Sequence, residues 1–178
     1  MAIALSSLGV QVFYQVAPEN VIPTGLTLSA LKNYEIPEVK SIPSLSPAPD
    51  TLETTPLSNQ EYKTYINGLK DLGGALEFTA NLTQQLLNIW NGTSSSDTNS
   101  VMYKFEHMND GKKDGDTLDA LWLIIRHPRL DNSVYFTFQP AKIGLPEMAV
   151  NSVLEATISI TPTGEVQWGD KVVDDTNT

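Results

Sequence analysis

Two histidines, His107 and His127, are the side chains best suited to acid–base or metal chemistry, because the chain contains no cysteine. Either could act as the base of a Ser-His-Asp triad, but no G-x-S-x-G turn is present to hold the nucleophile. The zinc-binding pattern H-E-x-x-H is also absent. His127 follows an apolar run and precedes Pro128, as expected at a strand end. We interpret both histidines as structural and predict no catalytic, cofactor-binding or metal-binding residues.

The run 109–116 has carboxylates spaced in a way that suggests calcium. An EF-hand loop places acidic ligands at alternate positions, then a glycine, and a glutamate at position twelve. Here Lys112 and Lys113 separate the carboxylates, and the required glutamate is missing. The segment is better interpreted as a solvated hairpin or connector.

The Gly73-Gly74 pair lacks the glycine pattern that cradles phosphate. It comes just before an apolar alternation that begins at Leu76, so it more simply allows the chain to turn. We expect a positive φ at one or more of Gly68, Gly73 and Gly74.

Acidic side chains exceed basic ones in both halves of the chain. The 178 residues carry 11 Lys and Arg against 21 Asp and Glu, a net charge of −10, and 40% are hydrophobic. Phosphate binding needs Lys and Arg, so this balance opposes nucleic-acid binding. Length and apolar content suit a single domain over 1–178.

The first 31 residues contain no Lys or Arg, and Gln11, Gln15 and Pro18 interrupt their apolar start. A secretory signal needs a basic start, and a membrane span needs about 20 apolar residues. We therefore expect a soluble protein that is made in the cytoplasm and has no membrane partner.

Alternation of apolar and polar residues dominates the pattern and predicts antiparallel strands with one buried face. The alternating runs are 10–16, 76–81, 133–139 and 154–160. The run 121–125 is apolar throughout and suits a strand covered on both faces. The segment 161–164 has Pro and Gly where a turn needs them, and should lead into a last strand that ends at Trp168.

One segment has helical spacing, in Leu82, Leu86, Ile89 and Trp90. Thr83 or Asn81 can cap its start, and Asn91-Gly92 can end it, which predicts a single short helix leaning on the sheet. The run 101–108 fits a helix and a strand equally well.

Several stretches resemble loops. Residues 17–33 and the proline-rich 36–56 are long connections, 93–100 is a polar connector, and 170–178 is a polar tail. Within 17–56, five apolar side chains have no obvious partner in one copy, so we predict an arm that contacts other subunits. These candidate contacts are Val21, Ile22, Leu26, Leu28 and Leu31.

Four stretches, in order along the chain, resemble the major tail tube proteins of long-tailed (siphovirus-type) bacteriophages. They are the "I-P" step at 42–45, the acidic-Thr-Thr step at 49–57, the "Y-I-x-G-L-x-D" step leading into "L-E-F" at 65–78, and the closing "P-T-G" hairpin with its final Trp at 149–168. The ordered set covers about 34–168, and 93–129 lies outside the matching motifs.

The resemblance implies an antiparallel β-sandwich or small barrel with one flanking short α-helix. It implies a non-enzymatic virion protein, with hexameric rings stacked into a hollow tube through which DNA passes without specific binding. The implied partners are other copies of the chain, a tape measure protein, a tail terminator and distal tail proteins. No cofactor is implied.

An acidic protein suits such a duct, since a wall that bound phosphate would hold the DNA. Two alternating strands offer polar faces for the wall, and one or both could face the lumen. The candidate lumen residues are Glu77, Thr79, Asn81, Glu155, Thr157 and Ser159.

Three other classes fit less well. A tube protein of a phage-tail-like bacteriocin or secretion machine would have the same fold. A β-sandwich binding module usually gathers aromatic residues on one face, whereas Trp90, Trp122 and Trp168 are scattered. A hydrolase is disfavoured by the thin catalytic inventory.

Overall fold

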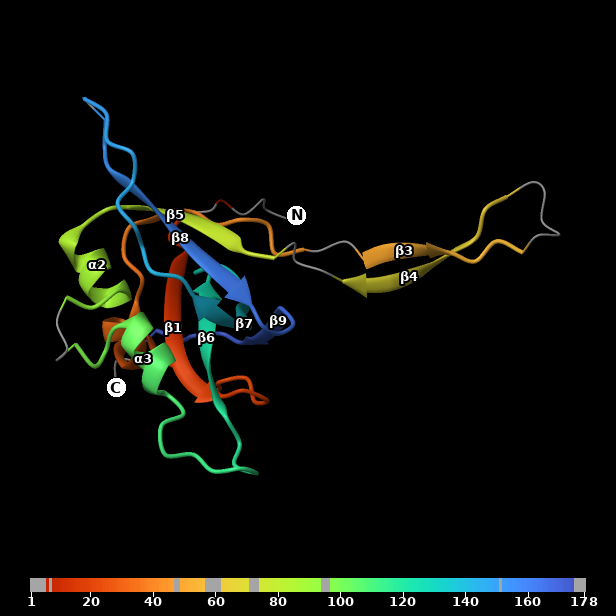
Figure 1. The fold of residues 1–178 in the computed structure, drawn as a ribbon, viewed down its shortest axis with the longest axis horizontal. Helices are drawn as coiled ribbons and strands as arrows, with labels where there is room; N and C mark the ends of the chain where they lie inside the picture. The colour runs from red at the N-terminus through yellow and green to blue at the C-terminus, as the bar shows by residue number, and fades with distance from the viewer. Residues whose placement is uncertain are drawn as a thin grey trace.

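The computed structural model describes residues 6, 8–46, 49–56, 62–70, 74–93, 97–150 and 152–174. Strands make up most of its regular structure (Figure 1). In chain order the elements are β1 (Gln11–Pro18), α1 (Leu28–Leu31), the 3-10 helix η1 (Lys32–Tyr34), β2 (Val39–Ser41), β3 (Pro49–Glu53), β4 (Tyr65–Lys70), β5 (Leu76–Asn81), α2 (Gln84–Trp90), α3 (Val101–His107), β6 (Asp119–Arg126), β7 (Asn132–Pro140), β8 (Glu155–Pro162) and β9 (Gln167–Asp170).

Seven strands form one antiparallel sheet in the order β1-β6-β7-β8-β5-β2, with β9 paired to β7. Each predicted strand is present, and β6 is buried along most of its length, as its apolar run indicated. The closing hairpin joins β8 to β9, which extends two residues beyond Trp168. The mainly β fold class is therefore confirmed.

A short segment between η1 and β2 connects the two edges of this sheet. Glu35 forms a β-bridge with Phe13 of β1, and the Ile36 amide donates to the Val12 carbonyl at 2.8 Å. A few residues later, β2 pairs with β5 at the opposite edge. The sheet thus closes into a small barrel, in agreement with the predicted architecture.

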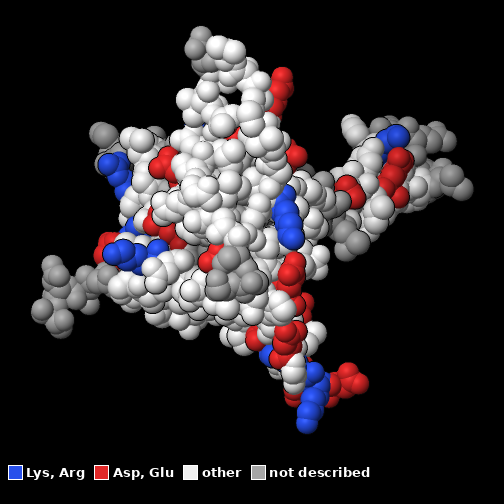
Figure 2. All heavy atoms as spheres, turned by 60° about the vertical axis from the view of Figure 1, so that its left-hand side comes forward, with Lys and Arg blue, Asp and Glu red and all other residues white. Residues whose placement is uncertain are grey.

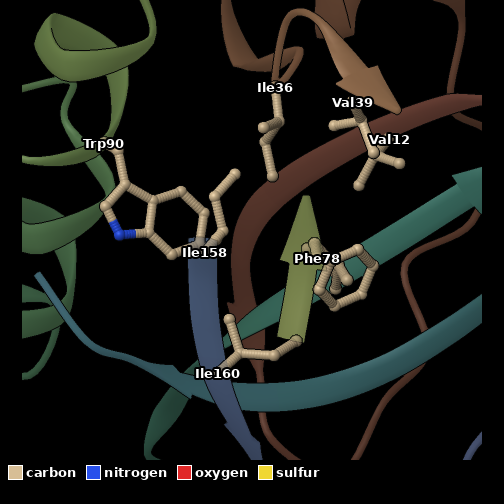
Figure 3. A pocket seen from close by; sticks show the side chains of 8 residues that line it. Val12, Ile36, Val39, Phe78, Trp90, Ile158 and Ile160 are labelled. Atoms are coloured by element: carbon tan, nitrogen blue, oxygen red, sulfur yellow. The ribbon is translucent and has the colours of Figure 1, made fainter. Parts of the chain in front are cut away.

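The barrel interior is filled by apolar side chains from nearly every strand. Figure 3 shows Val12, Phe78 and Ile158 around a pocket in this interior, with Trp90 of α2 at one side. The cavity between them has a volume of about 10 Å³. Trp90 stacks on Phe138 with ring centroids 6.3 Å apart, and its indole N–H donates to the Ala141 carbonyl at 2.7 Å. The predicted helix therefore closes the barrel core.

A second hydrophobic cluster lies on the other face of β1, β6 and β7. Its members are Phe13, Leu31, Trp122, Ile124, Tyr135 and Val172. Leu31 is 2% exposed, and Ile22, Leu26 and Leu28 pack against the cluster. The expectation that these side chains lack a partner within one copy is therefore wrong for these four residues, because α1 and η1 return the chain to the sheet.

The last described residues, 170–174, are held against this same face, so the predicted polar tail is wrong for them. Val172 is fully buried, and Val173 pairs with the segment 26–28 through two backbone hydrogen bonds of 3.0 and 3.1 Å. Residues 175–178 lie outside the described residues.

The described residues contain three short α-helices, where a single one was expected. The Thr83 hydroxyl caps α2 by accepting from the Leu86 amide at 3.1 Å, as predicted. The ambiguous run 101–108 forms α3, because the Ser100 hydroxyl accepts from the Tyr103 amide at 3.2 Å and starts a helix. No helix in the described part of the chain is long and apolar enough to cross a membrane.

β3 and β4 form a separate two-stranded ribbon that projects from the barrel (Figure 1). As the prolines of 36–56 indicated, β2 and β3 are short or lie at an edge.

Gly74, which follows the ribbon, has φ +86° and confirms the expected turn; Gly73 lies outside the described residues.

We expect Gly169→Ala to destabilise the barrel. An added Cβ would lie 2.9 Å from two ring carbons of Tyr135 and 3.1 Å from the Ile22 Cγ2. The Tyr135 ring is 1% exposed and cannot move away freely, so we predict a loss of about 1–3 kcal/mol in unfolding free energy. Urea denaturation would measure it. Gly144→Ala is the control, because its Cβ would meet nothing within 4 Å, and equal losses in both variants would contradict the prediction.

Alkaline pH should also weaken the fold through Tyr135. Burial, together with nearby Asp170, raises the pKa of Tyr135 from 10.0 to about 12. Between these values the unfolded chain binds fewer protons at this phenol than the folded chain, so unfolding free energy falls as pH rises, by at most about 1.4 kcal/mol per pH unit. Urea titrations from pH 9 to 12 should show a smaller fall in unfolding free energy for Tyr135→Phe than for the wild type. Tyr65→Phe, at an exposed site, should show the same fall as the wild type. Burial also raises the pKa of Tyr14, so part of the slope remains.

Candidate functional site

The ring nitrogens of both histidines contact polar groups of nearby residues. The His107 Nδ1 lies 2.7 Å from the Asp110 carboxylate one turn away, at the end of α3. The His127 Nε2 lies 2.7 Å from the Ser6 carbonyl, and its Nδ1 accepts from the Arg129 amide at 3.2 Å. That both histidines are structural stays a prediction. Within the described ranges, no group of three or more His, Asp or Glu side chains could hold a metal.

The run 109–116 forms the connector between α3 and β6. The Asp116 carboxylate accepts from the Lys113 amide at 2.9 Å, and Lys112 is 3.0 Å from Asp119. Gly111 and Gly115 have φ of +81° and +95°, which bend the backbone through tight turns. The carboxylates are thus used in local turn contacts, as the interpretation of a solvated connector requires.

The six polar residues predicted to face the lumen lie together on one face of β5 and β8. The strands pair directly, and each residue of the set on β5 is opposite one on β8. The pairs are Glu77 with Ser159, Thr79 with Thr157, and Asn81 with Glu155. The residues between them point into the barrel, where Phe78, Ala80 and Ile158 are at most 3% exposed. We call this surface the polar face.

The segment that closes the barrel extends the polar face. The Asn81 side-chain amide donates to the Glu38 carboxylate at 3.0 Å, and Lys40 forms an ion pair with Glu155. Both partners of this pair are close to half exposed, so it is worth about 0–1 kcal/mol at most. The face therefore carries three glutamates and a single lysine, and that lysine is engaged by a carboxylate.

The ribbon presents apolar side chains to solvent. Leu52 is opposite Ile66 across its strands, and these side chains are 56% and 54% exposed. Tyr65 is 52% exposed and is opposite Glu53, whose carboxylate lies 3.2 Å from the Lys63 ammonium. A two-stranded ribbon is only marginally stable alone, so docking onto another surface would stabilise this one.

The five predicted contact residues do not form one exposed patch. Val21 is 59% exposed, whereas Leu31 belongs to the second cluster and the other three pack against it. Any contact of these residues with another copy stays a prediction. Besides Val21, the large apolar side chain of 17–56 that is exposed in the described residues is Leu52, on β3 of the ribbon.

Arg126 is a structural anchor that the sequence pattern did not single out. It is 5% exposed at the end of β6. Its guanidinium donates to the Val172 carbonyl at 2.8 Å, to the Gln11 side chain at 2.9 Å and to the Asp174 carboxylate at 2.9 Å. The signal in the sequence that could have pointed to it is a single arginine at the end of a mostly apolar strand. The bonds to Val172 and Asp174 hold residues 172–174 beside the second cluster, and the bond to Gln11 ties them to β1.

The whole fold resembles solved structures from tail-like particles. One is described as the anti-feeding prophage baseplate, 6-fold symmetrised, and matches with TM-score 0.57 and 11% identity over 96% of this chain and 98% of that chain. Another, described as the sheath/tube terminator of an extracellular contractile injection system in its extended state, matches with TM-score 0.55 and 11% identity over 94% and 98%.

At such identity the likeness is one of fold, and it agrees with the tail-type β fold expected from the sequence. No protein-family model matches the sequence, and no curated protein does.

Proposed function

We propose that this chain is a structural subunit of a phage tail or tail-like particle, and that it forms the tube. In this proposal, hexameric rings of the chain stack into a hollow conduit for DNA. The observation that carries the proposal is the match of nearly the whole chain to nearly the whole of a chain from a six-fold tail-like assembly. The role is structural rather than enzymatic, and the protein works inside the particle together with other tail proteins.

The polar face supports the conduit, because it supplies a wall that does not bind DNA. Its glutamates would repel phosphates, and its one lysine, Lys40, is engaged by Glu155. Screening limits electrostatic effects to about 8 Å at physiological salt, so the side chains that face the lumen decide how DNA slides. In this proposal the polar face is the lumen wall.

The ribbon supports assembly, because it reaches beyond the barrel with apolar side chains that lack cover. Burying Leu52 and Ile66 against a neighbouring copy would contribute roughly 1.5–3 kcal/mol for each fully covered side chain. The further partners suggested by the sequence resemblance are a tape measure protein, a tail terminator and distal tail proteins.

A second candidate is a ring at one end of a tube. Both of the similar solved structures are described as end assemblies: one is a baseplate and the other is a sheath/tube terminator. Such a subunit would form rings but would not stack them into long tubes.

Negative-stain microscopy of the purified protein, concentrated and at low salt, tests the class directly. We expect rings that stack into tubes, because the ribbon offers each copy an adhesive arm. Single rings that never stack would favour the second candidate. A protein that stays monomeric at high concentration in both low and high salt would contradict both.

Charge on the polar face should decide whether tubes hold DNA. We expect Glu77→Lys with Thr157→Lys to give tubes that retain short duplex DNA, with retention falling steeply between 50 and 200 mM salt. Fluorescent duplex co-sedimenting with tubes would measure it. The control is Glu106→Lys with Thr117→Lys, which makes the same charge change at exposed positions on α3 and its connector. Equal retention by both variants would contradict the assignment of the polar face to the lumen.

A further inference from the structure

The loop between β7 and β8, residues 141–154, is a second projection from the barrel (Figure 1). Four of its large apolar side chains face solvent: Leu145, Met148, Val150 and Val153 are 77%, 58%, 92% and 71% exposed. In Figure 2 this loop is the projection at the top of the view, and its described atoms are almost free of charged groups. Monomeric proteins rarely leave so much apolar surface together unless it binds something.

The base of this loop is fixed by α2. The Asn91 side-chain amide donates to the Ile143 carbonyl and accepts from the Ile143 amide, both at 2.9 Å. The Trp90 indole holds the Ala141 carbonyl, and the Leu82 amide donates to the Leu154 carbonyl at 2.9 Å. The barrel therefore presents the apolar tip from an anchored base, which lowers the entropy lost on docking.

The ribbon carries the other concentration of exposed apolar groups in the described residues. Thirteen large apolar side chains are exposed in the described residues. Four lie on the loop, three lie on the ribbon (Leu52, Tyr65 and Ile66), and Tyr62 comes shortly before β4. The projections leave the barrel in different directions (Figure 1), so the surfaces of one chain do not cover each other. Each surface needs a second molecule.

We infer that the tip of the β7–β8 loop docks on the β3–β4 ribbon of a second copy of this chain. The inference rests on the proposed function, because growth into a tube needs a contact that joins two different surfaces. Pairing ribbon with ribbon, or loop with loop, gives a closed two-fold pair and ends growth. Pairing ribbon with loop leaves one free surface of each kind after every addition.

Charge does not oppose this contact, although each chain carries −10 overall. Residues 141–154 contain one lysine and one glutamate, and residues 49–70 contain two lysines and three acidic residues. The Glu53 carboxylate on the ribbon is paired with the Lys63 ammonium, 3.2 Å away. The acidic excess lies elsewhere, so these surfaces can approach without strong repulsion.

The lack of cysteine in the natural chain allows a direct test by cross-linking. The variants are Ile66→Cys on the ribbon and Val150→Cys on the loop, which are both exposed sites. They are mixed, assembled and treated with a short bismaleimide. We expect a covalent dimer in the mixture that is much weaker in either variant alone, and a ladder of higher oligomers from the chain that carries both cysteines.

The other outcomes separate the inference from the proposed function. Tubes that form without cross-linked pairs in the mixture would overturn the inference alone. Strong dimers from one variant by itself would show a two-fold contact and would also overturn it. Failure of the wild-type chain to form rings or tubes would remove the proposed function and the inference with it.

A charge placed at the tip provides an independent readout. We expect Val150→Asp to raise the protein concentration needed for assembly about tenfold or more, the effect of about 1.4 kcal/mol, without a change in melting temperature. Thr117→Asp makes the same charge change on the α3–β6 connector and should assemble as the wild type does. Normal assembly by Val150→Asp would overturn the inference.

Discussion

Unpaired strand edges are the constraint to which most of this fold responds. An open sheet of antiparallel strands leaves a row of unpaired N–H and C=O groups along each of its two edge strands, and natural proteins close or cover such edges. Here the chain uses the few residues from Glu35 to Val39 for this purpose, first pairing with β1 and then running into β2 beside β5. The barrel core, the position of α2 and the polar face all depend on this closure.

The sequence predicts the parts of the fold that a period of two or a helix cap specifies locally. The strands of the barrel, Thr83 as the cap of α2 and the grouping of polar residues on β5 and β8 follow from such short-range patterns. The direct pairing of β5 with β8 could not be predicted, because it depends on strand order. It is this pairing that turns two candidate polar faces into one surface.

The errors concern segments whose structure is decided by distant partners. Residues 17–33 resemble a loop locally, yet Leu31 is buried because Trp122 and Tyr135 offer an apolar surface far along the chain. Val172 looks like part of a polar tail, but Arg126 donates to its carbonyl, and the segment 26–28 pairs with the next residue, Val173. The run 101–108 was ambiguous because its apolar residues fit two periods, and the Ser100 cap decides for the helix.

The ribbon lies between two strands that are themselves neighbours. β2 and β5 pair directly, and Ile42 and Leu45 still pack against the barrel core. The chain from residue 46 to residue 75 is therefore one long excursion of a hairpin whose ends stay together. Doubling the length of such an excursion costs only about 0.6 kcal/mol in closure entropy. The barrel is therefore largely indifferent to the ribbon's length and sequence. Evolution can lengthen, shorten or replace this segment to suit a new neighbour while the same barrel continues to fold.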